Sequence, residues 1–442
     1  MSDQRTVLRD ARLPDGRVAD VTITDGAVSH IGSSERVDRD NIFLCRHQLL
    51  IPAAIDMHVH MRDGKQADKE TWISGTRSAL AGGVGFVVDQ PNTIPPLLTR
   101  DACLERLTLA QQGYTHFAIN GGISSGCTKA DIEAVWESGV LAFGEIFFGP
   151  SSYGEPISEQ MLVLALQECD AFDSLMTLHA EVVLGGEDVS LKTHDELRSI
   201  EGECAAIQTI IGLLHQNEFQ KEKSRLPRMH ICHVSSAQGI RMVAPLSHVS
   251  SEATPHHLLL SRDTISSDDM ADQVWYKMNP PLRTEKERKD LLQCWPLIDV
   301  IASDHAPHSV SDKGSDFSSA PSGVPGVETM VPLFMAKVRE GSLSLADLIQ
   351  KTVTSPAALL GIEPPGCSVG SRADFALYPN TITRIDGEKL HSKAGWSPFD
   401  GMDALFPSRV FIGGEVAYDA SGDVFTQRDT RWFCGKGFTG SY

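Results

Sequence analysis

Residues 49–60 read LLIPAAIDMHVH, an apolar run that ends on imidazole side chains. Seven more short apolar segments follow, and each also closes on polar residues: GVGFVVDQPN, THFAIN, VLAFGEIF, LMTLHAE, MHICHVSS, HVSSEATPHH and DVIASDHAPH. Most of them precede a helix-like stretch, such as KETWISGTRSALAG at 69–82 and TRDACLERLTLAQQ at 99–112. Eight alternations of strand and helix over about 300 residues predict an α/β fold of the (β/α)₈ TIM-barrel type.

A doubly wound open sheet is the competing fold. No GxGxxG nucleotide fingerprint supports it, although that absence is weak evidence. The polar residues gather at the C-terminal ends of the apolar segments, which is the face where barrel enzymes place their active sites. The pattern therefore favours the barrel and predicts chemistry at that face.

The two ends of the chain have a different texture. VADVTI and AVSHIG flank the turn pair Asp25-Gly26, and short strand-like segments return in ADFALYP, RVFIGG and EVAYDA. We therefore predict a small β-sandwich accessory domain built from residues 1–50 and 369–442. The catalytic barrel then occupies residues 51–368.

Composition excludes several classes of partner. The chain has 442 residues, with 39 Lys and Arg against 58 Asp and Glu, for a formal net charge of −19. With no basic run in the sequence, nucleic acid is not expected as a partner. No apolar stretch reaches the about 20 residues of a membrane span. Nine cysteines without a CxxC pair indicate reduced thiols, and the polar start indicates no secretion signal, so we expect a cytoplasmic protein.

Histidines at the predicted strand ends form a candidate metal site. His58 and His60 stand at i and i+2 on the first strand, so both side chains point to the same face. His179 ends the fifth strand, and His233 ends the sixth. His230, three residues before His233, is predicted to point to the opposite face and not to be a ligand. Four imidazoles at one end of a barrel suit Zn²⁺ or a similar divalent ion.

Two carboxylates stand in otherwise apolar strands. Asp304 closes VIAS, where a carboxylate is costly unless it is paired or binds a metal. Glu145 interrupts VLAFGEIFFG and is predicted to bridge two metals, or else to lie outside the barrel against a Lys or Arg. His305 and His308 follow Asp304, and we expect only one of the two to reach the site.

Several motifs together resemble dihydroorotases of the cyclic amidohydrolase superfamily. They are DMHVHMRDG, DQPNTIPP, HICHVSS, EATPHHLLL, KMNPPLR, ASDHAPH and SGVPGVE, in this order between about residues 50 and 378. The resemblance implies a metal-dependent hydrolase that reversibly converts dihydroorotate to N-carbamoyl-aspartate in pyrimidine biosynthesis. It also implies a barrel beside a small β-sandwich, a small-molecule substrate and one or two Zn²⁺ per subunit, and it leaves a homodimer open.

The resemblance also assigns roles. The metal ligands would be His58, His60, His179, His233 and Asp304. Asp304 would also be the catalytic acid/base for attack by metal-activated water. Arg62, Asn92 and His308 would hold the substrate carboxylate, since a planar guanidinium suits a carboxylate. The ring would contact Asn279 and the backbone around Ser322 and Gly323, and His60 would also lie against the substrate.

The sequence departs from this pattern in two places. Many relatives carry a carboxylated Lys between two metals in a motif like FKIF, where this chain reads FGEIF. Glu145 would then bridge as an ordinary carboxylate. The Glu-Pro that commonly follows the Arg of HVHMR is also absent, which concerns the shape of the loop.

Three rival functions remain. A hydantoinase or dihydropyrimidinase shares the fold and metal site, but its substrates lack the carboxylate that Arg62 and Asn92 would bind. Allantoinase is disfavoured on similar grounds. A non-catalytic scaffold relative is the third, and it would tend to lose metal ligands that this chain retains.

Overall fold

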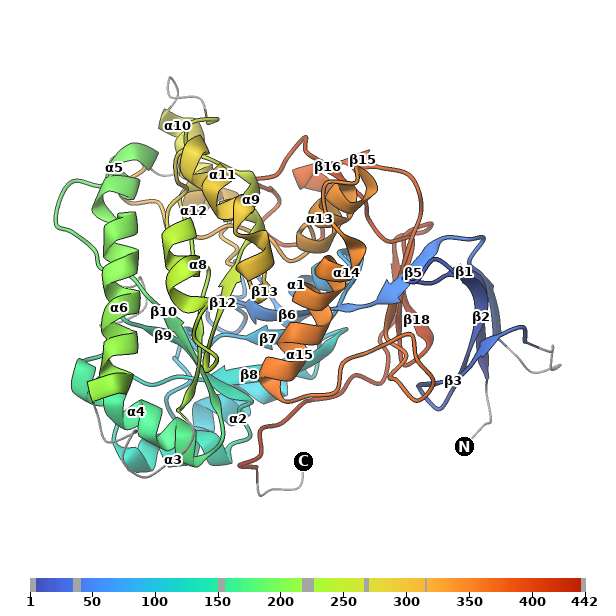
Figure 1. Ribbon diagram of the computed structural model, residues 1–442, viewed down its shortest axis with the longest axis horizontal. Coiled ribbons are helices and arrows are strands. Elements are labelled where there is room, and N and C mark those ends of the chain that lie inside the picture. The colour runs from blue at the N-terminus through green and yellow to red at the C-terminus, as the bar shows by residue number, and fades with distance from the viewer. Residues whose placement is uncertain are drawn as a thin grey trace.

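Eight parallel strands form the centre of the computed structural model, which describes residues 5–34, 41–149, 156–216, 226–265, 270–314 and 316–438. They lie side by side in chain order (Figure 1). They are β6 (Ala54–Val59), β7 (Val84–Asp89), β8 (His116–Gly121), β9 (Ala142–Phe147), β10 (Leu175–His179), β11 (Arg228–Ile231), β12 (Val249–Ala253) and β13 (Val300–Ile301). Between the last strand and the first, the His60 amide donates to the His305 carbonyl at 2.8 Å. The predicted barrel is confirmed, with the ring almost closed.

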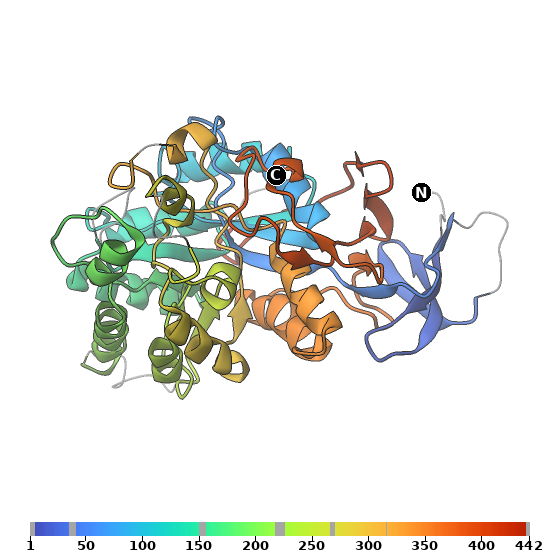
Figure 2. The ribbon, with the colours of Figure 1, turned by 90° about the horizontal axis from the view of Figure 1, so that it is seen from above.

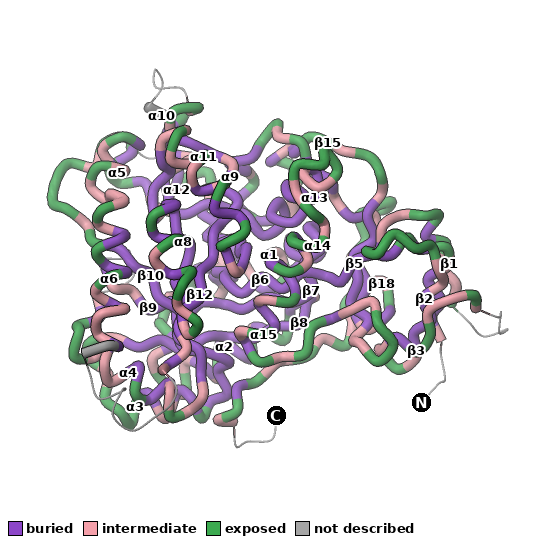
Figure 3. Tube along the Cα trace, viewed as in Figure 1, coloured by how far each residue is buried: buried purple, intermediate pink, exposed green. Residues whose placement is uncertain are grey.

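Helices cover the outside of this ring, so the strands are buried on both faces (Figure 3). The main ones are α1 (Trp72–Ala81), α2 (Arg100–Ala110), α3 (Lys129–Glu137), α4 (Glu159–Ala171), α6 (Ile200–Gln216), α8 (Ala237–Val243), α11 (Glu285–Gln293), α13 (Met330–Arg339) and α15 (Ser355–Leu360). Shorter ones lie in the connections: α5 (Leu191–Leu197), α9 (Pro255–Leu259), α10 (Met270–Gln273), α12 (Val310–Lys313) and α14 (Leu345–Ile349). Within the described ranges, no helix is long and apolar enough to cross a membrane.

Ser or Thr residues begin most of these helices. Each of these side chains accepts a hydrogen bond from a backbone amide of the first turn, which satisfies a donor that the helix leaves open. The caps are Thr71, Thr99, Thr128, Ser158, Ser190, Ser236, Thr254 and Thr284. The loops that leave the C-terminal ends of the strands are therefore fixed at their far ends by local sequence.

A nine-stranded sheet joins the two ends of the chain beside the barrel (Figure 1). Its strands are β1 (Thr6–Arg12), β2 (Val18–Thr24), β3 (Ala27–Gly32), β4 (Asn41–Leu44), β5 (Leu49–Pro52), β14 (Phe375–Tyr378), β17 (Arg409–Ile412), β18 (Glu415–Asp419) and β19 (Val424–Phe425). β5 pairs antiparallel with β14, so the two ends do meet as the sequence predicted. Asp25 and Gly26 both have positive φ and form the two-residue turn between β2 and β3.

The segment 49–60 was predicted as one strand, and this is wrong. Its first part is β5 of the nine-stranded sheet, and its second part is β6 of the barrel. The division falls at Ala53, whose amide donates to the carbonyl of Asp374, the residue before β14. Apolarity runs unbroken across this point, so the sequence pattern carries no sign of it.

Two parts of the predicted accessory segment 369–442 pack on the barrel instead, as Figure 2 shows for the red C-terminal part of the chain. β15 (Thr383–Arg384) and β16 (Asp403–Ala404) form a small separate sheet, and Phe399 between them packs with Met278 and Leu333. Further on, Phe433 contacts Phe86 of β7, with ring centroids 5.0 Å apart. Residues 1–4, 35–40 and 439–442 of the predicted accessory domain lie outside the described residues, and the predicted domain boundaries stay a prediction.

His391 joins the barrel to the nine-stranded sheet. Its Nδ1 lies 2.8 Å from Glu328 before α13, and its Nε2 lies 2.8 Å from Asp423 between β18 and β19. Burial lowers the pKa of His391, but hydrogen bonds and charge from the two carboxylates outweigh it and raise the pKa to about 9. Both ring nitrogens therefore donate, and the ring is an imidazolium at neutral pH.

This ion triad predicts a pH-dependent stability. The folded pKa lies above the unfolded value of about 6.5, so the contribution is complete below about pH 6.5 and is lost as the pH rises through about 9. Solvent screening limits it to about 1 kcal/mol. Melting temperatures of the wild type and His391→Gln, measured from pH 6 to 9.5, should differ most at pH 6 and converge at pH 9.5. A constant difference would contradict the assignment.

Candidate active site

His58 and His60 lie at the C-terminal end of β6, and both are buried. His58 Nδ1 lies 2.6 Å from Glu252 Oε1, so this nitrogen carries the proton. His58 Nε2 has no hydrogen-bond partner among the described residues and lies 3.5 Å from Glu145 Oε2 and 3.6 Å from Asp304 Oδ1. The His60 ring places Nδ1 2.8 Å from Asn92 Oδ1 and Nε2 3.0 Å from Asp304 Oδ1.

Asp304 follows β13 in a left-handed conformation, with φ of +45°. A non-glycine residue in this region is strained, and such strain collects at functional sites. This conformation turns the carboxylate toward the histidines of β6, across the junction between the last and the first strand of the barrel. Burial raises the pKa of Asp304, but the His60 hydrogen bond and the nearby His58 and His233 rings lower it below its usual value, so the group is ionised at neutral pH.

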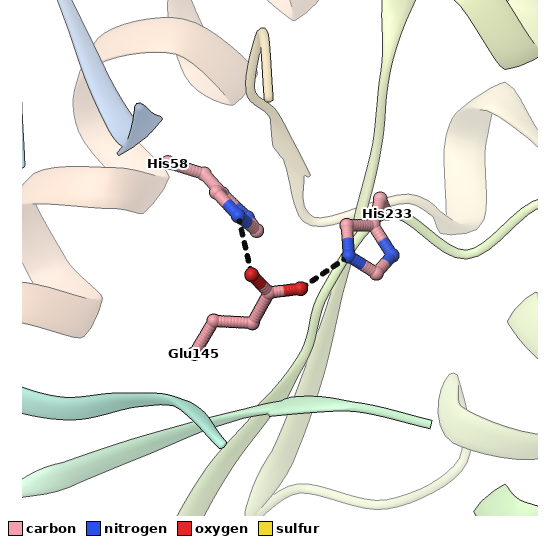
Figure 4. A group of neighbouring side chains, drawn as sticks. All are labelled: His58, Glu145 and His233. Carbon is pink, nitrogen blue, oxygen red and sulfur yellow. Dashed lines mark hydrogen bonds and ion pairs between the residues drawn. The ribbon is translucent and has the colours of Figure 1, made fainter. Parts of the chain in front are cut away.

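Glu145 occupies the centre of the group, as Figure 4 shows. Its Oε1 lies 2.7 Å from His233 Nε2 and 3.0 Å from His179 Nδ1, while its Oε2 faces His58 and His60 at 3.5 and 4.0 Å. The alternative that Glu145 lies outside the barrel against a Lys or Arg is therefore wrong. Burial raises the pKa of Glu145, and the surrounding histidines outweigh this and lower it well below the usual range.

His179 ends β10, and His233 lies two residues beyond the end of β11. His233 has φ of +35°, which breaks the alternation of the strand and turns the ring into the site. His230 was predicted to point to the opposite face, and this is wrong. His230 Nε2 lies 3.0 Å from Glu252 Oε2, on the carboxylate that also holds His58. The strand parity argument failed because β11 ends at Ile231, before His233.

Two buried carboxylates that the sequence analysis missed hold the histidines from behind. Glu252 of β12 contacts His58 and His230, and Glu181 Oε2 lies 3.0 Å from His179 Nε2 and also contacts Arg198. Carboxylates behind metal-binding histidines fix their tautomer and orientation. Glu252 stands in the quoted motif EATPHH and Glu181 follows His179 by two, so an acidic residue at the C-terminal end of a predicted strand was the available signal.

The donor atoms fit a divalent metal. His58 and His179 each have one ring nitrogen on a carboxylate behind it, so the lone pair of the other nitrogen faces Glu145. The lone pair of a neutral imidazole that faces a buried carboxylate is repelled by it. A cation bound to both groups makes this arrangement favourable. Without a metal, protons on the imidazole rings balance the carboxylates instead. Burial lowers the pKa of His179, but the hydrogen bonds and charges of Glu145 and Glu181 outweigh it and raise the pKa to about 9.

The group divides into two halves that have His58 in common, and Glu145 of the second half faces the first half through its Oε2. His58, His60 and Asp304 have ligand atoms within 4.8 Å of one another, and so do His58, Glu145 and His233. His179 joins the second half through Glu145 and His233. All six predicted metal ligands thus come together at the C-terminal face of the barrel.

A cavity opens over this group. Besides the histidines and the two carboxylates, its walls are formed by Arg62, Asn92, Phe147, Asn279, Ala306, Ser322 and Gly323. Arg62 is 2% exposed and has φ of +49°. The Arg106 guanidinium donates to the Arg62 carbonyl and holds Asp89 at 2.7 Å, and Asp89 in turn accepts from the Met61 amide. A cation in a buried wall beside the metal group is a site for an anionic part of a ligand.

His308 lies behind the wall of the cavity. Its Nδ1 lies 3.1 Å from Lys69 Nζ, and its Nε2 lies 3.1 Å from the Ser322 carbonyl. Burial and the charges of Arg62, Lys69 and Lys313 lower the pKa of His308 well below its usual value, so the neutral ring accepts from Lys69 and donates to Ser322. Direct contact between His308 and a ligand stays a prediction. His305 faces Glu70 and the Gly326 amide instead.

Comparisons with known proteins agree with this description. The Amidohydrolase family matches residues 49–416. A Methanosarcina acetivorans protein named dihydroorotase is 38% identical over 429 residues, covering 91% of this chain and 89% of that protein. One of the same name from Halobacterium salinarum is 35% identical over 438 residues, covering 96% and 99%.

Solved structures share the fold over nearly the whole chain. The L-hydantoinase from Arthrobacter aurescens has a TM-score of 0.83 and 25% identity, covering 99% of both chains. A D-hydantoinase from Thermus sp. has a TM-score of 0.86 and 20% identity, covering 98% of this chain and 99% of that one. A barrel with a buried imidazole and carboxylate group at its C-terminal face defines the class of metal-dependent barrel hydrolases. The chain belongs to the Amidohydrolase family, and it is a hydrolase.

Gly144 is predicted to be required for the position of Glu145. It has φ of +137°, and a methyl group built there would overlap the hydroxyl and carbonyl oxygens of Thr177 in the adjacent strand. Gly144→Ala should therefore lower stability by more than about 2 kcal/mol and weaken metal binding, as strand and carboxylate move. Chemical denaturation and metal analysis of the dialysed protein test this. Gly126→Ala, where no atom of the described residues lies within 4 Å of the added methyl, is the matched control.

Proposed function

We propose that the chain is a dihydroorotase, which reversibly hydrolyses the cyclic amide of dihydroorotate to N-carbamoyl-aspartate in pyrimidine biosynthesis. Arg62 is the observation that carries the proposal, because it places a buried guanidinium in the wall of the cavity beside the metal group. Dihydroorotate has a ring carboxylate that would pair with it. Relatives at 31–38% identity that carry this name support the same function.

A hydantoinase is the alternative within the same family. Hydantoin and dihydrouracil have the cyclic amide but no carboxylate, so they offer no anionic group to the guanidinium that Arg62 places in the cavity wall. Asn92 gives a second reason to prefer a substrate with a carboxylate. His60 occupies its Oδ1 at 2.8 Å, which leaves the amide NH₂ to donate to a substrate carboxylate. Both groups therefore suit the charged substrate.

The metal is proposed to be Zn²⁺, one or two per subunit. His58, His60 and Asp304 would hold one ion, and His179 and His233 the second, with Glu145 between them. When bound, the metal supplies a Lewis acid that polarises the amide carbonyl and makes water a nucleophile at neutral pH. Glu145 has one carboxylate oxygen toward each half of the group, which supports its role as an ordinary carboxylate bridge.

The protein residues would then bind, orient and move a proton. Arg62 and Asn92 fix the ring through its carboxylate, and Asn279 with the backbone at Ser322 and Gly323 holds the opposite side. Asp304 is ionised and borders the cavity, so its carboxylate can accept the proton of the attacking water. It then returns that proton to the ring nitrogen as the amide bond breaks.

Removal of the proposed base should abolish turnover. Asp304→Asn keeps the size of the side chain but cannot accept the proton, and we expect dihydroorotate hydrolysis, followed at 230 nm, to fall at least about a hundredfold. Metal content measured on the same sample separates lost chemistry from lost metal. Asp403→Asn, an exposed carboxylate on β16, should keep full activity. A metal-loaded Asp304→Asn enzyme with normal turnover would refute the role.

Arg62 should determine the choice of substrate. Arg62→Met should lower kcat/KM for dihydroorotate about a hundredfold, through the lost charged pair, and leave the weak rate on dihydrouracil nearly unchanged. The ratio of the two kcat/KM values is the measurement. If the wild type prefers hydantoin or dihydrouracil, the chain is a hydantoinase; if purified protein is metal-free and inactive, it is a scaffold.

The remaining sequence predictions belong to this proposal. They are a cytoplasmic location, no nucleic-acid or membrane partner, and a homodimer left open. The formal net charge of −19 supports a small-molecule substrate recognised by local cations such as Arg62, since a polyanion would meet an acidic surface.

A further inference from the structure

We infer that His194 is a positioning residue that turns the amide of Asn279 so that its NH₂ group donates into the cavity. This rests on the proposed function in that Asn279 is taken to face the substrate ring. His194 lies on α5, in the long connection after β10, and is 1% exposed. Asn279 is half-buried and borders the cavity.

The two ring nitrogens of His194 both face acceptors. Nδ1 lies 3.0 Å from Asp188 Oδ2, and Nε2 lies 2.9 Å from the Met278 carbonyl. A backbone carbonyl can only accept, so Nε2 carries a proton. Burial raises the pKa of Asp188, but the hydrogen bond and charge of His194 and the charge of Lys277, 3.2 Å away, outweigh it and lower the pKa. The carboxylate is thus ionised and accepts from Nδ1.

This proton fixes the side chain of Asn279. Nε2 also lies 3.0 Å from the end of that side chain, and an N–H there requires an acceptor, which is Oδ1. The NH₂ group is then the polar end left for the cavity, and within the described residues no hydrogen bond uses it. Asn279 would therefore recognise a ring carbonyl oxygen of the substrate and not a ring N–H.

The surroundings hold His194 in place. Lys277, the residue two before Asn279, donates to the Phe317 carbonyl at 2.7 Å and pairs with Asp188. The His194 ring also packs edge-on against Phe317, with centroids 5.9 Å apart. The Gly323 amide donates to the Lys277 carbonyl at 3.0 Å. The network joins the insertion after β10 to both segments that form the ring side of the cavity.

A double-mutant cycle tests the inference. His194→Phe keeps the ring packing on Phe317 but removes both donors, and we expect kcat/KM to fall about tenfold, mainly through KM, for one misdirected hydrogen bond. Asn279→Ala should cause a loss of at least that size. The double variant should be no worse than Asn279→Ala alone, because His194 acts only through Asn279. Additive losses would overturn the inference.

Asn279→Asp distinguishes the two orientations of the amide. It keeps an oxygen for His194 and loses the NH₂ group, so the inference expects a loss close to that of Asn279→Ala. Retained activity would mean that the oxygen serves the substrate and would overturn it. His116→Phe is the matched control, since His116 is a buried histidine at the start of β8, at the opposite end of the barrel.

A second readout does not depend on turnover. The side-chain amide resonances of Asn279, identified in ¹⁵N-labelled protein by their loss in Asn279→Ala, should shift in His194→Phe and stay in place in His116→Phe. Unshifted resonances in His194→Phe would overturn the inference. Failure of the proposed function is separate: it appears as a wild type that does not hydrolyse dihydroorotate, and the cycle is then run on the cyclic amide that it does hydrolyse.

Discussion

The burial of Glu145, Asp304 and Glu252 inside one ring of strands is the constraint on which the rest of the site depends. Charges in a low-dielectric interior must be matched by a cation or by hydrogen bonds. The matching groups are histidines, and the surrounding backbone is shaped to deliver them. His233 and Asp304 both adopt left-handed conformations that turn their side chains inward. The same demand explains the position of Glu145, because its two oxygens face histidines on both sides.

Much of this could be predicted from the sequence because two kinds of pattern are local. The eight apolar segments appear as β6 to β13, since strand length and apolar content are encoded within each segment. That His58 and His60 point to the same face could be predicted from the two-residue period of a strand alone. Glu145 and Asp304 stood out because a carboxylate inside an apolar run is costly without a partner. Once the barrel forms, it brings these residues together, and no further sequence signal is needed to predict that they meet.

Other parts depend on contacts that no local pattern contains. The direction of the His233 side chain depends on where β11 ends, and the ends of strands are the feature that a sequence predicts least reliably. The contacts of the His308 ring with Lys69 and the Ser322 carbonyl are one example. Lys69 lies far from His308 in the chain, so only the folded structure shows the pair. The return of residues 383–404 to the barrel is of the same kind, because their apolar side chains pack on Leu333 of α13 and on connecting segments that include Met278.

That return has a consequence for synthesis on the ribosome. Trp396 donates to the His308 carbonyl, and Ser392 donates to Glu70, which faces His305 beside Asp304. All eight barrel strands have been made by Ile301, yet these contacts require a further stretch of chain to emerge. β5 already has β1 on one side, but its antiparallel partner β14, in which Phe375 pairs with Pro52, is made only later. Residues 392–396 therefore complete the surroundings of the catalytic face only after the segments of all eight barrel strands have been translated.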